Sequence, residues 1–376
     1  MRLSGALRAA AVSMAAALML AACGDPALDR DMYLRKKNLA AIPPTQPVDI
    51  RKLIWPENDY IGLAYDGDIP SGLKRRGEFD DLVGRPHNLL KYFEEFGAHF
   101  KTTENKKIWD AGALPFADVE PYEGTLKDFV DGKYDADIEA YAAEVKASNI
   151  PLAYSWGHEM NGWWYPWGYC SKSGEFTGTG TKKDPEDIGD ACKGESKENT
   201  PEDFVAAWRH IHDIFTKVGV GNVIWVWSPN TAQGEGLPPV KEFYPGDEYV
   251  DWIGVSGYMY KVKNEPKDEP GIFMDVFGPL YKELRTFTEK PVVIAETGST
   301  ATRRKAADVH RLLKGSVRFP DILGYVWFEV KKVEFGNETD FRVAARPDAV
   351  KRYRKDLASK WGQRLGFDPE QLINDD

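Results

Sequence analysis

The sequence predicts a single (β/α)8 barrel of the TIM type, and three observations support this fold class. Apolar runs typical of strands alternate with amphipathic runs typical of helices along most of the chain. Continuously apolar strands are typical of a parallel sheet that helices cover. About eight such units in roughly 300 residues suit a closed barrel better than a doubly wound sheet. The segment after the first strand, LAYDGDIPSG, also lacks the glycine spacing of a dinucleotide-binding loop.

The predicted elements follow one another in a regular order. The strand candidates are 60–65, 98–103, 111–119, 150–156, 222–228, 252–258, 291–296 and 322–328. The helix candidates repeat apolar residues at three- and four-residue steps, and they are 87–96, 135–148, 200–218, 273–289 and 303–317. Thr200 is the expected N-cap of the third helix, and Pro201 suits its first position.

The N-terminus is typical of an export signal. Arg2 and Arg8 precede an apolar run that is too short to span a membrane comfortably. The run ends in Leu-Ala-Ala-Cys, which resembles the lipobox of bacterial lipoproteins and implies a lipid on Cys23. The alternative is an ordinary signal peptide with an incidental cysteine. We therefore expect a lipoprotein signal peptide at 1–22, a flexible tether at 23–55, a catalytic domain at 56–360 and a C-terminal tail at 361–376. The protein would be exported and held on a bacterial membrane by its lipid alone, facing the periplasm or the cell surface.

The net charge and the cysteine content indicate which binding partners, disulfides and metal sites to expect. The formal net charge is -10 and no long basic run is present, so we expect no nucleic-acid partner and a neutral substrate. Cys170 and Cys192 remain after Cys23, and an even pair in an exported protein predicts a disulfide, with two free thiols as the alternative. Cysteines and histidines do not have zinc-site spacing, so we expect no metal site.

Polar and aromatic side chains follow the predicted strands, at the end of a barrel where active sites form. They are Asp66, Glu120, His158, Glu159, Asn230, Tyr258, Glu296 and Trp327. Glu159 follows the fourth strand and Glu296 ends the seventh, so their carboxyl groups are expected to face each other across the barrel. Glycoside hydrolysis needs such a pair, and a separation of about 5–5.5 Å would mean retention of anomeric configuration.

Aromatic residues around Glu159 complete this interpretation. Trp156, Trp163 and Trp164 would give the acid an apolar surrounding that raises its pKa. Indole rings would also stack on sugar rings, while His158 and Asn161 would hydrogen-bond sugar or catalyst. Alternatives remain for three residues: Asn230 is equally suited to capping a turn, and Asp66 and Glu120 to holding loop backbone.

The segment GHEMNGWWYPW (157–167) resembles the signature of glycoside hydrolase family 26, a group of retaining (β/α)8 enzymes. The resemblance runs from about residue 58 to 355 and includes VEPY, VWSPN, DWIGVSGY, AETGS and GYVWF. It implies that Glu159 is the acid/base and Glu296 the nucleophile. It also implies that His158 and Trp164 contact sugar, that Tyr258 hydrogen-bonds the nucleophile, and that Trp327 forms the floor of the -1 sugar site. Ser155 stands where the family usually has arginine, so either another donor compensates or activity is weakened.

These observations predict a retaining endo-β-glycosidase that acts on a neutral β-linked polysaccharide. β-1,4-Mannan is the first expectation, and mixed-linkage β-glucan or trimming of a bacterial exopolysaccharide are the alternatives. A hypothesis of a different class is a polysaccharide-binding lipoprotein without turnover, which Ser155 favours. Two carboxylates suffice for the hydrolysis, so we expect no cofactor, and we expect a monomer.

Overall fold

The computed structural model describes residues 34–39, 49–169, 199–232, 237–259, 271–300, 304–334 and 337–374. The expectations for Cys23, Cys170 and Cys192 lie outside the described residues. Within the described residues, helices that combine the length and the apolarity needed to cross a membrane are absent.

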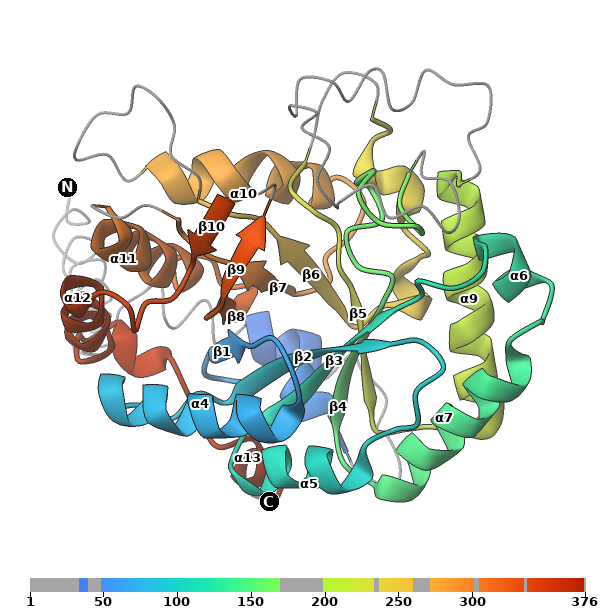
Figure 1. Ribbon diagram of the computed structural model, residues 1–376, viewed down its shortest axis with the longest axis horizontal. Coiled ribbons are helices and arrows are strands. Elements are labelled where there is room, and N and C mark those ends of the chain that lie inside the picture. Colours follow the sequence, from blue (N-terminus) through green and yellow to red (C-terminus); the bar gives the residue numbers. More distant parts are fainter. Residues whose placement is uncertain are drawn as a thin grey trace, which may run out of the picture.

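A closed, all-parallel barrel forms the centre of the molecule, which confirms the predicted (β/α)8 fold (Figure 1). Its strands pair in sequence order, and β1 closes the barrel against β8. Their bounds are β1 Tyr60–Ala64, β2 Leu89–Glu95, β3 Leu114–Glu120, β4 Leu152–Trp156, β5 Val223–Trp227, β6 Trp252–Ser256, β7 Val292–Thr297 and β8 Ile322–Phe328.

Helices surround this barrel (Figure 1). They are α4 Ile69–Val83, α5 Thr102–Asp110, α6 Leu126–Val130, α7 Asp135–Ser148, α9 Pro201–Val218, α10 Gly271–Leu284, α11 Lys305–Ser316 and α12 Pro347–Leu357. The predicted start of α9 is confirmed, because the Thr200 hydroxyl accepts a hydrogen bond from the Asp203 amide and the Asp203 carboxylate accepts one from the Thr200 amide. A short antiparallel hairpin, β9 Lys331–Glu334 and β10 Asn337–Asp340, follows β8.

The prediction for the second unit was wrong. Residues 87–96 were expected to be a helix and 98–103 a strand, but β2 occupies Leu89–Glu95 and helix α5 begins at Thr102. Lys91 and Glu94 lie inside β2, and they are only 1% and 5% exposed. These two polar residues interrupt the apolar run and leave a three- and four-residue spacing, which imitates a helix.

The apolar core has two layers, one inside the barrel and one between barrel and helices. Gly324 disturbs the strand alternation in β8, since its φ of +136° favours glycine and a Cβ there would lie 2.0 Å from the Tyr60 carbonyl oxygen. Beyond it, Phe328 belongs to the inner layer and Trp327 to the outer layer. The pairing of β7 with β8 is irregular in the same region.

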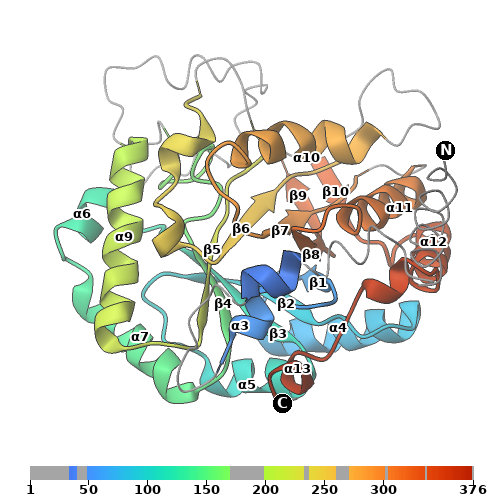
Figure 2. The same ribbon diagram turned by 180° about the vertical axis from the view of Figure 1, so that it is seen from behind.

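The amino end of the barrel is closed by segments that we assigned to the tether and the tail. Arg35 is 2% exposed and pairs with Asp59, just before β1, and its guanidinium also donates to the Pro56 carbonyl. Helix α3 (Arg51–Ile54) packs against helix α13 (Pro369–Asn374) on this side of the molecule (Figure 2). The described parts of both segments therefore belong to the folded body.

Candidate active site

Glu159 lies on the loop after β4, where the backbone turns sharply. Gly157 and Glu159 have positive φ angles of 59° and 56°, and the Glu159 amide donates to the Ser228 carbonyl at 2.7 Å. A positive φ is uncommon for a side chain other than glycine and is often found at functional sites. The Glu159 carboxyl group is held at both oxygens, by Trp164 Nε1 at 2.7 Å and by Asn230 Nδ2 at 2.8 Å.

Glu296 lies in β7, at a register irregularity with β6. Lys91 Nζ donates to its Oε2 at 2.9 Å, and the Tyr258 hydroxyl donates to its Oε1. The predicted contact of Tyr258 with Glu296 is therefore present. Glu159 and Glu296 are 6% and 7% exposed, so both residues are buried.

The two glutamates have opposite electrostatic surroundings. Burial raises the pKa of Glu159, and the nearby Glu296 charge adds to this effect against the opposing His158. Burial would also raise the pKa of Glu296, but Lys91, His158 and the Tyr258 hydroxyl outweigh it and lower that pKa. A protonated acid beside an ionised carboxylate is the division of roles that glycoside hydrolysis requires.

A chain of alternating charges lies beneath the two glutamates. Lys91 Nζ contacts Asp118 Oδ2 at 2.7 Å as well as Glu296, and Asp118 Oδ1 lies 3.2 Å from His158 Nδ1. Burial opposes the charge on His158, but Asp118 outweighs it and raises the pKa of His158 to about 9. Burial would raise the pKa of Asp118, yet His158 and Lys91 hold it well below its usual range. His158 is therefore a buried cation near neutral pH, with Nε2 3.1 Å from the Tyr165 hydroxyl.

Asn161 and Asn230 act on the loop and on the acid. Asn161 is 1% exposed and donates to the carbonyls of Asn230 and Ala232, while its Oδ1 accepts from the Asn230 amide. These bonds hold the 230–232 loop, so the Asn161 side chain, predicted to hydrogen-bond sugar or catalyst, is engaged with this loop. Asn230 serves both of its alternatives, since Oδ1 accepts from the Ala232 amide and Nδ2 donates to Glu159.

Glu120 and Asp66 occupy different environments. Glu120 ends β3, and burial, opposed by His158 and reinforced by Asp118, raises its pKa to about 7. It lies close enough to Glu296 to feel its charge, so it belongs to the site. Asp66 follows β1 with a side chain 59% exposed, and it pairs with Arg75, whose guanidinium also donates to the Asp66 carbonyl. These contacts fit the loop-holding alternative for Asp66.

Two predicted aromatic residues lie away from the cleft. Trp327 is fully buried in the outer layer, and its indole nitrogen donates to the Phe341 carbonyl at 3.0 Å. Trp156 is 1% exposed and packs on Phe129 and Phe204. Both were expected at the sugar site, and the strand alternation instead turns them toward the helices.

Phe328, the next residue along β8, lies in the inner layer instead. Its ring lies 6.2 Å from that of Tyr258 and 6.3 Å from that of Phe93, beside the residues that hold Glu296. Trp164 lies beside Glu159, and its ring centre is 4.8 Å from that of Trp163 in an edge contact. Its hydrogen bond lowers the pKa of Glu159, whereas Trp164 was expected to raise that pKa. Sequence analysis missed Phe328, Lys91 and Asp118, and the signal available for the last two was a charged residue between two apolar neighbours.

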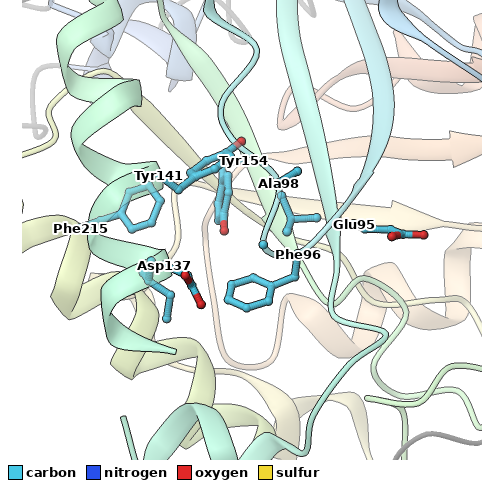
Figure 3. Close-up of a pocket in the computed structure, with 10 residues that line it drawn as sticks. Glu95, Phe96, Ala98, Asp137, Tyr141, Tyr154 and Phe215 are labelled. Carbon is cyan, nitrogen blue, oxygen red and sulfur yellow. The ribbon is translucent and has the colours of Figure 1, made fainter. Parts of the chain in front are cut away.

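A small cavity lies outside the barrel, between its β2–β4 side and helices α7 and α9 (Figure 3). Its lining includes Phe96, Ala98, Asp137, Tyr141, Tyr154 and Phe215. The space open to a water-sized molecule is about 20 Å³, enough for about one water and too small for a sugar ring. Glu159 and Glu296 do not line this cavity, so it is not part of the candidate active site.

Comparison with known proteins points to one family of enzymes. The family model described as glycosyl hydrolase family 26 matches residues 119–279. The chain is 29% identical over 287 residues to Endoglucanase H of Acetivibrio thermocellus, which covers 75% of this chain and 28% of that protein. It is 24% identical over 245 residues to a mannan endo-1,4-beta-mannosidase of Bacillus subtilis, with 64% of this chain and 52% of that protein covered. The chain thus spans from about a quarter to about half the length of these relatives.

Solved structures share the barrel. A GH26 beta-mannanase from Bacteroides ovatus aligns with a TM-score of 0.54 at 14% identity, over 90% of this chain and 95% of that one. The Bacillus subtilis mannanase BCman aligns with a TM-score of 0.51 at 15% identity, over 77% of this chain and 89% of that one. At these identities the likeness establishes the fold alone.

Proposed function

We propose that this chain is a family 26 glycoside hydrolase, which the match of residues 119–279 to the family model and the (β/α)8 barrel support, and that it cleaves a neutral β-linked polysaccharide internally, with retention of configuration. One observation carries the proposal. Two buried glutamates have different partners: the neutral side chains of Trp164 and Asn230 bond Glu159, whereas the ammonium group of Lys91 and the hydroxyl of Tyr258 bond Glu296. Burial therefore raises the pKa of Glu159, while the Lys91 charge lowers that of Glu296. Such a pair provides a proton donor and an ionised nucleophile at the same pH.

The proposed reaction has two displacements. In the first, a Glu296 oxygen attacks the anomeric carbon, the glycosidic C–O bond breaks, and Glu159 gives its proton to the departing oxygen. In the second, Glu159 takes a proton from water, the water oxygen bonds to the anomeric carbon, and Glu296 leaves as a carboxylate. The bonds from Trp164 and Asn230 orient Glu159, and those from Lys91 and Tyr258 orient Glu296.

β-1,4-Mannan is the first proposed substrate, supported by the mannosidase of Bacillus subtilis among the relatives. A β-glucan is the second candidate, favoured by the higher identity and longer match to Endoglucanase H. The hypothesis of a binding protein without turnover loses its support, because Lys91 supplies a cation at Glu296 where Ser155 does not.

The test is release of reducing sugar from mannan, mixed-linkage β-glucan and xylan. Wild type is compared with Glu159→Gln and Glu296→Gln, each checked for folding by circular dichroism. Proton NMR of the first products, read before mutarotation, reports retention of the β-anomer. Binding of a polymer with no cleavage of any of them would establish the binding protein instead, and α-anomeric first products would overturn retention.

We also propose export and lipid anchoring through Cys23, on the strength of the Leu-Ala-Ala-Cys sequence. The full chain expressed in a bacterium would incorporate labelled fatty acid and partition with membranes, whereas Cys23→Ser would do neither. A disulfide between Cys170 and Cys192 belongs to the same proposal. Intact-mass analysis with and without reductant tests it, and two thiols that react with iodoacetamide before reduction would contradict it.

A further inference from the structure

We propose that Lys91, held in place by Asp118, is the positioning cation of the Glu296 nucleophile, and that the small side chain of Ser155 leaves room for it. This inference rests on the proposed function, since it gives Glu296 the role of nucleophile. The residues that position the nucleophile would then lie within strands β2 and β3, whereas Glu159 lies on the loop after β4.

The path of the Lys91 side chain supports this assignment. Lys91 is 1% exposed, and its ammonium group lies 4.8 Å from the ring centre of Phe93 and 5.4 Å from that of Phe116. It therefore rises from β2 among aromatic rings to reach Glu296 on β7. Ordering such a long side chain without solvent is costly, so its end point needs strong partners.

The charge balance shows why the partner is the nucleophile. A buried lysine paired with one buried aspartate would already be neutralised, and Asp118 is 0% exposed. Asp118 is itself shared, because His158 lies 3.2 Å from its other oxygen. Two cations around one aspartate leave a net positive charge, and the Glu296 carboxylate balances it. The charges of Lys91, His158, Asp118 and Glu296 therefore sum to zero only while Glu296 is ionised. The ionised form is the one that a nucleophile needs.

Residue 155 occupies the alternative position for such a cation. Ser155 is the β4 register partner of Asp118 and is 0% exposed, with its hydroxyl donating to Ser228 Oγ at 3.3 Å. An arginine at 155 would start beside Asp118 and compete with Lys91 for the same carboxylates. The small side chain of Ser155 leaves space for the Lys91 ammonium group beside Asp118. Substitutions at residues 91 and 155 are therefore expected to have non-additive effects on kcat/KM.

The test is the acid limb of the kcat/KM profile, which reports ionisation of the free-enzyme nucleophile. Glu296 feels Lys91 from β2, His158 and Tyr258 from the loops after β4 and β6, and the carboxyl groups of Glu159 and Glu120. Lys91→Met removes one cation and leaves the others. It is expected to move the acid limb upward by about 1–3 pH units and to lower kcat/KM by roughly 100-fold or more.

Arg35→Met is the matched control, because it also removes a buried cation from a buried aspartate, at the other end of the barrel. Both variants are expected to lose thermal stability, but Arg35→Met keeps the wild-type acid limb. If Lys91→Met lowers the melting temperature yet leaves the acid limb in place, its role is structural only and the inference is overturned. Lys91→Gln repeats the measurement if the methionine variant does not fold.

A double-mutant cycle supplies an independent readout. Ser155→Arg is expected to reduce kcat/KM in the wild-type background and to raise it in Lys91→Ala, because one cation is then exchanged for another. Equal effects of Ser155→Arg in the two backgrounds would overturn the coupling between residues 91 and 155. The proposed function is judged separately: it fails if wild type and Glu296→Gln release the same sugar, whereas this inference fails if they differ and Lys91→Met behaves as wild type.

Discussion

The indole nitrogen of Trp164 donates a 2.7 Å hydrogen bond to Oε2 of Glu159, five residues earlier on the same loop. A donor to the carboxylate stabilises its charged form, so this bond opposes the burial that raises the pKa of Glu159. Trp164 therefore moderates the effect of burial on the acid strength of Glu159 and also places an aromatic ring beside it.

Trp164→Phe is predicted to move the alkaline limb of the kcat/KM profile upward by roughly half to one pH unit. The sign follows because loss of the donor raises the pKa of Glu159 further, and Glu159 acts in its protonated form. Trp163→Phe is the control, since it changes the neighbouring indole and leaves the bond to Glu159. An alkaline limb that stays or moves downward in Trp164→Phe would contradict this account.

Glu120→Gln is predicted to stabilise the protein at alkaline pH. The pKa of Glu120 is raised to about 7 when folded, against an ordinary value of 4.5, so its contribution to stability is fully present below pH 4.5 and is lost as pH rises through 7. Glutamine imitates the protonated carboxyl group and removes this loss. Melting temperatures of variant and wild type should agree at pH 4.5 and diverge in favour of the variant at pH 8; a constant difference at both values would refute the prediction.

Trp327→Phe and Phe328→Leu are predicted to separate stability from substrate binding. Trp327 fills the outer layer and bonds the Phe341 carbonyl, so its truncation should lower stability by about 1–3 kcal/mol with KM unchanged. Phe328→Leu should raise KM several-fold, because its ring lies beside Tyr258 in the site. Chemical denaturation and steady-state kinetics on the same preparations check both, and the reverse assignment of effects would restore Trp327 to the sugar site.

Asn161→Ala is predicted to lower the free energy of unfolding by about 1–3 kcal/mol, because it leaves the amide of Asn230 and two carbonyls without their buried partner. Asn230→Ala should instead lower kcat by removing a direct bond to Glu159, with a smaller loss of stability. Urea titrations and kcat values distinguish the two. If both variants lost the same free energy of unfolding and the same kcat, Asn161 and Asn230 would not have the separate roles assigned to them.

The sequence predicted the candidate site residues that come after a strand. Glu159 and Glu296 each come directly after an apolar run, and in a barrel that position alone predicts the functional end. Lys91 and Asp118 lie within strands, where a charge breaks the apolar pattern and is taken for a solvent-facing position. Their burial becomes visible only once β2, β3 and β7 are closed around a common axis.

Trp327 and Phe328 lie in layers opposite to those expected, and this difference has another cause. Alternation along β8 is disturbed at Gly324, whose backbone conformation a simple two-residue period does not contain. Every side chain after it changes face relative to the expected pattern, so neighbouring aromatics exchange layers. A glycine inside a strand marks the possibility of such a bulge, but only the packing against Tyr60 locates it.

Arg35 sets a practical lower limit on how far the protein can be trimmed for production. It reaches from before β1 to the Asp59 carboxylate and to backbone carbonyls near the start of β8. A recombinant chain that started at the first strand would strip Asp59 of its nearest counter-charge and uncover the underside of the barrel. Shortened expression clones should therefore retain everything from ahead of Arg35, even though Glu159 and Glu296 lie at the opposite end of the barrel.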